Sequence, residues 1–465
     1  MKKRIICLLL VFVFVASLTS CFRDERKYDY DDMSKYVEII NYKGFEVEIK
    51  EDYIQQQIDT YIQSYSTPYK AKKGDVINVN LEFTEVIWLD ADKKIDKKGD
   101  VISDLGIKNK VINKLGEGSY NKALEEEIIK MGVQITKKTE KIITLPNDAM
   151  FGKYAGKEVY FSCEFVSKPC LRGDVVVVDY TGYHLDSNGE IKKNDKGEEE
   201  TFDTGKDAAF YIGSNLAIKD FENGLIGAEV GVAKDIKATF PEDYGSEDLK
   251  GKTVLFKVTV KSIKEAPIYN DEFVKKMGYN STEEFESYLK NEYAYNYLNN
   301  ELLEKSTFKE YPKSEYENME RQFEQLNTQY LSLYGISYED FVLMYYGYTK
   351  DEFIKSSMDV ELVYYAIAQK ENYDPSPADL EAAKEALIQD QINTILSQNT
   401  GMTAEQARPQ AVEYVEQELG TTIIYDEAIF TKVEKVLRAS YTIKMVKAEN
   451  TSVTTERAEA AKNNK

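Results

Sequence analysis

The sequence predicts an α+β protein of several domains, in which two tandem copies of a small antiparallel sheet with one short helix precede an all-α region. Two observations predict the sheets. Residues 118–168 recur as residues 213–263, and both segments contain runs in which apolar and polar residues alternate. A third observation predicts the helices, because apolar residues after Pro267 recur every three and four positions.

The repeat keeps the residues that set backbone conformation. Most matches lie at one offset of 95 positions, and an upstream match lies at 99, so one loop differs by four residues. The matched pairs are Gly118 and Gly213, Gly132 and Gly227, Pro146 and Pro241, and upstream Gly74 and Gly173. We therefore place the first copy at residues 72–168 and the second at residues 169–266.

Each copy has the pattern of strands with one short helix. The residues from Val254 to Val260 alternate apolar and polar, which is typical of a half-buried strand. Residues 218–225 are a short amphipathic segment closed by Gly227. An antiparallel sheet wrapped on one helix follows from this pattern.

The chain outside the repeat completes the organisation. Residues 39–71 have the pattern of a strand and then a helix, and residues 267–450 that of one long helical region. Capping signals support the helices, such as Ser376-Pro377 at a helix start and Gly335 at a helix end. We expect residues 451–465 to be a disordered tail.

The amino-terminal residues predict export. Three basic residues precede the apolar run 5–16, which is too short to span a bilayer, and Leu18-Thr19-Ser20-Cys21 follows. This order predicts a signal peptide at residues 1–20 and an acidic tether at residues 21–38. The last four residues resemble a bacterial lipobox, which implies lipidation of Cys21 and an extracytoplasmic protein anchored to the cell membrane by lipid.

Charge and composition exclude several classes of partner. The chain carries a net charge of −21, and the segment after the basic leader carries −24, which argues against nucleic acid as a partner. Cys163 and Cys170 are too far apart along an extended chain for a disulfide, so we expect two free thiols. With His184 as the one histidine, we expect no metal site and no cofactor.

The second copy contains an ordered set of short motifs. In chain order they are Tyr180-Thr181-Gly182, Phe202-Asp203-Thr204-Gly205, Ile212-Gly213, Gly224-Leu225-Ile226-Gly227, Phe240-Pro241-Glu242-Asp243-Tyr244-Gly245 and Leu249-Lys250-Gly251-Lys252. This set resembles the FKBP-type prolyl isomerases, in the version found in trigger factor. The resemblance implies a peptidyl-prolyl cis–trans isomerase whose pocket residues are Tyr180, Phe202, Asp203, Ile218, Phe221, Tyr244 and Phe256. Three features depart from the family pattern, namely Ala208 in place of an aromatic, Asp220 in place of a glycine, and a long charged loop from His184 to Thr201.

These residue types suit the chemistry. Rotation about an Xaa-Pro bond must overcome an amide barrier of about 18–20 kcal/mol. An apolar pocket favours the twisted amide, which has lost charge separation, over the planar one. The Tyr180 hydroxyl and the Ile218 backbone N–H can orient substrate carbonyl groups, and Asp203 supplies a carboxylate at the pocket edge.

The first copy lacks these residues. At the offsets of the repeat, Leu81 stands in place of Tyr180, Ala123 in place of Ile218 and Glu126 in place of Phe221. We expect a domain that keeps the fold without the pocket.

The helical region resembles the carboxy-terminal chaperone domain of trigger factor. The similar segments are Asn270-Asp271-Glu272-Phe273, Tyr311-Pro312-Lys313-Ser314-Glu315 and Ala366–Tyr373. The resemblance implies unfolded or nascent exported polypeptides with Xaa-Pro bonds as partners. No basic ribosome-docking segment precedes the repeat, so we expect no ribosome contact. Tyr345, Tyr346 and Tyr348 are candidates for client contact.

Two functions remain open on the sequence. One is a foldase, which isomerises prolyl bonds and acts as a chaperone for exported chains at the outer face of the membrane. The other is a non-catalytic holdase chaperone or envelope scaffold that uses its FKBP-like domains as binding frames. Tyr180 and Asp203 favour the enzyme, whereas Ala208 and the first copy favour the binding protein.

Overall fold

The structure, a computed structural model, describes residues 32–447 except residues 95 and 400. The chain divides into two compact units. The sheet unit holds residues 52–285, and the helical unit combines the chain before residue 52 with the chain after residue 285. Within the described residues no helix has the length and apolar character needed to cross a membrane. The leader and Cys21 lie outside the described residues.

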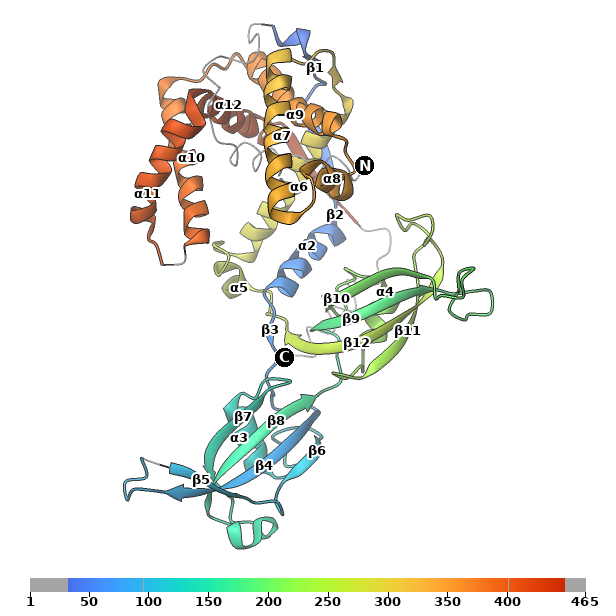
Figure 1. The fold of residues 1–465 in the computed structure, drawn as a ribbon, viewed down its shortest axis with the longest axis vertical. Helices are drawn as coiled ribbons and strands as arrows, with labels where there is room; N and C mark the ends of the chain where they lie inside the picture. Colours follow the sequence, from blue (N-terminus) through green and yellow to red (C-terminus); the bar gives the residue numbers. More distant parts are fainter. Residues whose placement is uncertain (1–31, 95, 400, 448–465) are drawn as a thin grey trace. The chain divides into compact units, whose positions relative to one another are not determined.

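The first repeat is a five-stranded antiparallel sheet with one helix (Figure 1). The strand order is β5-β4-β8-β7, and β6 also pairs with β4. The helix buries Leu124 and Ile128 in the core that it shares with the sheet. The elements are β4 (Ile77–Trp88), β5 (Asp96–Val101), β6 (Ile107–Ile112), α3 (Lys122–Met131), β7 (Lys138–Thr144), η2 (Ala149–Tyr154) and β8 (Glu158–Ser167).

The second repeat has the same strand order, β10-β9-β12-β11. Its single long strand β10 pairs along β9 across an irregularity between Gly205 and Ala208, so it replaces both β5 and β6. The short strand β3 (Thr67–Pro68) adds a fifth strand beside β12. The elements are β9 (Asp174–His184), β10 (Thr201–Tyr211), α4 (Lys219–Leu225), β11 (Ala233–Thr239) and β12 (Thr253–Glu265).

The helices of the two repeats match in a different register from the one predicted. Buried Glu125 and buried Glu222 each accept hydrogen bonds from three backbone N–H groups of the loop before the helix. These loop residues are Gly116, Gly118 and Tyr120 in the first repeat, and Gly213, Asn215 and Ala217 in the second. Equivalent residues are thus 97 positions apart, and the gapless offset of 95 was wrong here. The longer helix α3 absorbs the two extra residues before its terminal Gly132.

Two thiols lie in the interior of the sheet unit. Cys163 and Cys170 are both free and fully buried. Burial raises the pKa of each thiol to about 12. Both therefore stay protonated and unreactive in the folded chain.

The helices of the helical unit (Figure 1) bury apolar side chains in clusters, among them one around Leu298 and Leu362, one around Phe323 and Phe353, and one around Ile392 and Ala411. The predicted caps are present: Ser376 caps α10 with Pro377 at its first position, and Gly335 ends α7 with a φ of 72°. The helices are α6 (Thr282–Lys305), α7 (Lys313–Tyr334), α8 (Tyr338–Tyr346), α9 (Lys350–Lys370), α10 (Pro377–Gln398), α11 (Ala404–Glu413), the π-helix η3 (Tyr414–Leu419) and α12 (Gly420–Arg438). The short α5 (Asp271–Lys275) and α2 (Glu51–Ser64) precede them in the chain.

The expectation of an all-α region was wrong at its end. The chain closes in β14 (Tyr441–Val446), which pairs in parallel with β2 (Phe45–Lys50). β2 is the strand predicted within residues 39–71. Its side chains Val47 and Ile49 are fully buried, so this strand is part of the folded helical unit. A strand of this length cannot bury both side chains without a partner.

The predicted tether at residues 21–38 was too long. Met33 in η1 (Met33–Lys35) and Val37 in β1 (Val37–Glu38) are buried, with 1% and 3% of their surface exposed. β1 pairs with β13 (Thr307–Phe308). Met33 and Val37 are apolar residues within an acidic segment, and they pack against side chains of the helices. The folded chain therefore includes residues 33–38.

Candidate active site

Two neighbouring strands carry the polar part of the candidate site. β9 contributes Tyr180 and β10 contributes Asp203, and the Tyr180 hydroxyl donates a 2.7 Å hydrogen bond to a carboxylate oxygen of Asp203. Burial, followed by the bond to Asp203 and its charge, raises the pKa of Tyr180 to about 12. The phenol therefore stays protonated at neutral pH and remains a hydrogen-bond donor.

Aromatic side chains form the floor of the site. Phe221 from α4 and Phe256 from β12 are 3% and 5% exposed, and their ring centroids lie 4.8 Å apart. The Tyr180 ring lies 5.9 Å from Phe221 and 6.0 Å from Phe256. Phe202 from β10 lies 5.6 Å from Phe256. All four contacts are edge-to-face, the arrangement that aromatic pairs favour.

Two glycines give these rings their space. A Cβ on Gly182 would lie 2.6 Å from the Phe202 ring, and a Cβ on Gly205 would lie 2.2 Å from the Tyr180 ring. Side chains at either position would push the ring away from its neighbours. The glycines of the two motifs are thus needed for close approach of rings to the backbone.

Ile218 precedes α4 and has an extended backbone, with a φ of −62° and a ψ of 137°. Its carbonyl accepts from the N–H groups of Phe221 and Glu222, while within the described residues its own N–H donates to no protein group. Buried Glu222 holds the preceding loop through Ala217 N–H. The Ile218 N–H is therefore fixed in place and available to an acceptor from outside.

The segment after β11 covers one side of the floor. Phe240 lies 5.9 Å from Phe202, and Tyr244 lies 4.5 Å from Phe240. Tyr244 is 39% exposed, and its proximity contributes to the raised pKa of Tyr180. The structure therefore brings the seven residues expected from the sequence to one face of the second repeat. Among the described residues, no group of His, Cys, Asp or Glu is arranged to hold a metal ion.

Comparison with known proteins agrees with this geometry. Residues 167–261 match the family of FKBP-type peptidyl-prolyl cis-trans isomerases. The chain is 34% identical over 256 residues to trigger factor of Lysinibacillus sphaericus, which covers 50% of this chain and 56% of that protein. It is 42% identical over 121 residues to trigger factor of Clostridium perfringens, covering 25% and 26% of the two chains. Residues 167–261 are thus an FKBP-type domain, in a chain that is similar to trigger factor over about half of its length.

The similarity is partial in extent. The chain spans about half the length of the first of these curated relatives and about a quarter of the second. A solved structure of the trigger factor chaperone is similar over 58% of this chain and 61% of that chain. Its sequence is 18% identical to this one, and the TM-score is 0.21.

The FKBP-type domain contains one aromatic that sequence reasoning missed. Phe210 lies 4.9 Å from Phe221 and 5.9 Å from Tyr180. It follows Ala208 by two positions and so lies on the same face of β10. The two-residue spacing in a predicted strand could have indicated that Phe210 lines the site in place of the aromatic residue that Ala208 replaces.

The other two departures from the family pattern have structural roles. Asp220 accepts a 3.1 Å hydrogen bond from the Thr239 N–H at the end of β11. The long loop after His184 is itself paired, with bridges between Leu185 and Ile191 and between Lys193 and Glu199. The loop therefore forms an ordered arm next to the site, since the His184 ring lies 5.2 Å from Phe202.

In the first repeat, side chains fill the equivalent space. Leu81 pairs with Cys163 as Tyr180 pairs with Val258, so Leu81 does take the place of Tyr180. In the same register Phe83 takes the place of Gly182. Phe83 is fully buried and lies 5.2 Å from Phe161. It occupies room that Gly182 leaves to Phe202.

The helix equivalences in the first repeat need correction. With the two-residue slip, Leu124 takes the place of Phe221, and Asn121, which caps α3, takes the place of Ile218. The expectation that Ala123 and Glu126 stand there was wrong. Leu124 is fully buried whereas Glu126 is exposed, so the site is absent because it is filled and not because it is charged.

Proposed function

We propose that the FKBP-type domain catalyses cis–trans isomerisation of Xaa-Pro bonds. The observation that carries this proposal is the Tyr180–Asp203 hydrogen bond at the edge of a floor made of Phe202, Phe221 and Phe256. The family match supports it. The arrangement offers an apolar surface for the proline ring and hydrogen-bond donors beside it.

The catalysis would need no nucleophile. The twisted amide in the transition state is less polar than the planar ground state, so an aromatic floor binds it more tightly. The Ile218 N–H, which is fixed and free, can take the carbonyl before the proline. The neutral Tyr180 hydroxyl, already oriented by Asp203, can hold a second carbonyl. Fixed donors of this kind need no reorganisation during the twist.

We further propose that the helical unit binds unfolded polypeptides as a chaperone. Apolar side chains are exposed where α7 ends and α8 follows. Leu331, Leu343, Met344 and Tyr345 have between 53% and 65% of their surface exposed. Of the tyrosines expected to contact clients, Tyr345 is in this group, while Tyr346 and Tyr348 are half-buried against the neighbouring cluster. Similarity to trigger factor supports this role.

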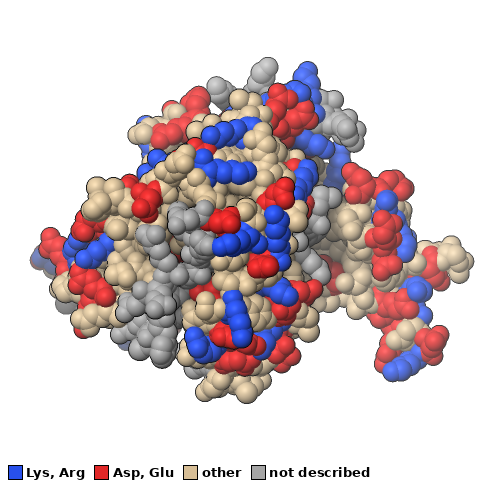
Figure 2. Space-filling view, turned by 90° about the horizontal axis from the view of Figure 1, so that it is seen from above, with Lys and Arg blue, Asp and Glu red and all other residues tan. Residues whose placement is uncertain are grey.

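We also propose that the protein acts outside the cytoplasm, held to the membrane through lipid on Cys21, with exported chains as its clients. The support is the sequence Leu18-Thr19-Ser20-Cys21 after an apolar run. On the face drawn in Figure 2, acidic and basic side chains are mixed. A surface of this kind is better suited to an unfolded protein as a partner than to the phosphate backbone of a nucleic acid. A Cys21→Ser variant should lose acyl labelling and leave the membrane fraction. Absence of acyl label on the wild-type protein would rule out the anchor.

The second candidate function is a non-catalytic holdase or scaffold. The filled site of the first repeat and the exposed apolar group on α7 and α8 favour it. A proline-limited refolding assay separates the candidates. If the enzyme proposal holds, the purified protein accelerates refolding at catalytic concentrations and residues 169–266 alone retain that activity, while residues 72–168 alone have none. A protein that only delays aggregation at molar excess, without changing the slow phase, is a holdase.

A further inference from the structure

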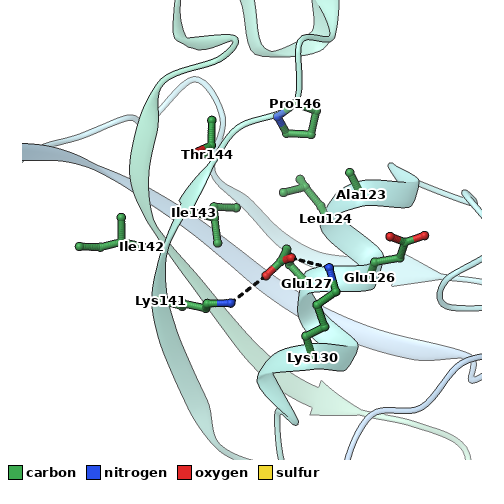
Figure 3. A pocket seen from close by; sticks show the side chains of 10 residues that line it. All are labelled: Ala123, Leu124, Glu126, Glu127, Lys130, Lys141, Ile142, Ile143, Thr144 and Pro146. Atoms are coloured by element: carbon green, nitrogen blue, oxygen red, sulfur yellow. Dashed lines mark hydrogen bonds and ion pairs between the residues drawn. The ribbon is translucent and has the colours of Figure 1, made fainter.

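The first repeat contains a hollow beside its helix. The hollow measures about 380 Å³ and lies between α3 and the edge strand β7 (Figure 3). Leu124 and Ala123 come from the helix, Ile143 and Thr144 from the strand, and Pro146 from the chain just after it. Leu124, which takes the place of Phe221, lines this hollow, whereas the packed rings Phe83 and Phe161 do not.

Two contacts between helix and edge strand differ between the repeats, and these differences explain why the hollow is open. In the second repeat Gly224 lets α4 rest on β11, since a Cβ there would lie 2.3 Å from Ile236. The equivalent pair in the first repeat is Glu127 and Lys141, which form a 3.1 Å ion pair instead (Figure 3). A glutamate and a lysine need more room than a glycine and an isoleucine, so helix and strand stand apart.

The second pair concerns the end of the edge strand. In the second repeat the Asp220 carboxylate accepts from the N–H of Thr239 and so covers the end of β11. The equivalent residues in the first repeat are Ala123 and Thr144. The Ala123 side chain has no hydrogen-bond acceptor for the Thr144 N–H, so it leaves the end of β7 uncovered. The strand β7 also stands apart from its helix.

The backbone of β7 is therefore able to pair with another strand. Within the described chain β7 pairs with β8 alone. Leu145 exchanges hydrogen bonds on the β8 side with Gly156 and Lys157. Because donors and acceptors alternate along an antiparallel strand, the N–H and C=O groups of Thr144, Ile142 and Glu140 point to the open side. An unprotected edge of this kind is a template for a further strand.

We propose that β7 and the hollow beside it bind an extended polypeptide segment, which pairs with β7 and places an apolar side chain in the hollow against Ala123 and Pro146. Charge defines a second feature of the segment. Lys130 and Lys141 are both paired with Glu127. Glu126 at the rim is exposed and has no ion-pair partner among the described residues. The segment therefore carries a basic side chain next to the apolar one. The inference rests on the proposed chaperone role for the source of such segments.

The test uses the full chain after the leader and a defined probe. The probe is a fluorescein-labelled nonapeptide of alternating valine and threonine with one lysine, and fluorescence anisotropy measures its binding. We expect saturable binding. A variant that copies the second repeat, Ala123→Asp with Glu127→Gly and Lys141→Ile, should weaken binding at least about tenfold, because the helix then closes on the strand and covers its end. Ala149→Asp, the same change at the exposed first residue of η2 outside the hollow, should bind as the wild type does.

Two further measurements identify the mode of binding. A probe with N-methyl groups on the residues that face β7 should not bind, whereas the same groups on the alternate residues should leave binding intact. The amides of Glu140, Ile142 and Thr144 should exchange hydrogen more slowly when the probe is bound. Glu126→Gln should weaken binding of the lysine probe about threefold and leave a norleucine probe unchanged.

The outcomes are separable from those of the isomerase and chaperone proposals. No binding by the wild type, or equal binding by the triple variant, would overturn the inference. Concentration-dependent dimers that the triple variant abolishes, without probe binding, would assign the edge to a second copy and would also overturn it. Because the substitutions lie outside the FKBP-type domain, proline-limited refolding by the triple variant should be unchanged. If the wild-type protein binds the probe but does not suppress aggregation, the result supports this inference and contradicts only the chaperone role proposed for the helical unit.

Discussion

Tyr180 and Asp203 are on different strands, 23 positions apart, and are joined by one 2.7 Å hydrogen bond. Leu81, at the equivalent position, cannot form that bond, and Phe83 in place of Gly182 removes the room for Phe202. The two repeats thus share a backbone and differ in whether a few positions hold a ring, a glycine or an aliphatic side chain.

The Tyr180 hydroxyl should contribute to catalysis without supporting the fold. In Tyr180→Phe the ring contacts with Phe221 and Phe256 remain, and only the bond to Asp203 and to substrate is lost. A hydrogen bond of this kind contributes about 1 kcal/mol, so kcat/KM for a prolyl peptide should fall about fivefold. Tyr183→Phe, on the same strand, is the matched control and should retain full activity. Equal loss in both variants would remove the role of the hydroxyl.

Phe221 should contribute through its ring. The change that copies the first repeat is Phe221→Leu, because Leu124 is its structural equivalent. The leucine fills most of the volume, so the domain should stay folded while kcat/KM falls about tenfold through lost aromatic contact. Phe221→Glu would also bury a charge and should destabilise the domain. Leu124→Phe in the first repeat should create no activity, and activity in that variant would contradict the role given to Phe83.

At the scale of elements, the helical unit contains a partly buried carboxyl on α12, near Asp390 of α10. Glu427 on α12 accepts a 3.1 Å hydrogen bond from the Thr431 hydroxyl. Burial raises its pKa to about 7, and the charges of Asp390 on α10 and of Glu434 and Asp426 on α12 add to the effect. The folded chain therefore holds a proton on this carboxyl that the unfolded chain releases at a lower pH.

This arrangement predicts that the helical unit is less stable at higher pH. A folded-state pKa raised above the unfolded value of 4.5 gives stability that is present below that value and is lost as the pH rises through 7. The loss should reach up to about 3 kcal/mol in the free energy of unfolding. Urea unfolding followed by helical circular dichroism at pH 5 and pH 8 measures it. Glu427→Gln should remove most of this dependence, whereas Glu405→Gln, at an exposed position, should preserve it. An unchanged slope in Glu427→Gln would contradict the assignment.

For the whole molecule, the chain before residue 52 and the chain after residue 285 fold as one unit. Ile49 in β2 is fully buried and pairs with Met445 in β14. Truncating such a side chain costs about 2–5 kcal/mol. Ile49→Ala should therefore lower the urea midpoint of the helical unit, although the substitution lies nearly 400 positions before β14.

The same variant tests whether the units are independent. The isomerase activity proposed for the FKBP-type domain should persist in Ile49→Ala at urea concentrations that unfold the helical unit, because the sheet unit has its own core. Glu48→Ala, at an exposed neighbour in β2, should change neither transition by more than about 1 kcal/mol. Loss of both signals together in Ile49→Ala would show that the units unfold as one.

Patterns within short stretches of the sequence predicted the local features of this protein. Alternation around Phe256 and the caps at Ser376 and Gly335 are short-range patterns, and each depends on a residue and its near neighbours. The motifs of the second repeat also identified the residues that meet in the site. These predictions agree with the structure because backbone preference and side-chain alternation act within a few residues.

Contacts between distant segments set which surfaces pack against each other. The two-residue slip in α3 was invisible because Gly132 and Gly227 stay in register on its far side, and hydrogen bonds to Glu125 and Glu222 were needed to reveal it. The pairing of β2 with β14, and the open edge of β7, likewise depend on contacts between distant segments. Burial and strand pairing are properties of two surfaces together, so a pattern within one segment specifies which side chains are apolar but not which partner covers them.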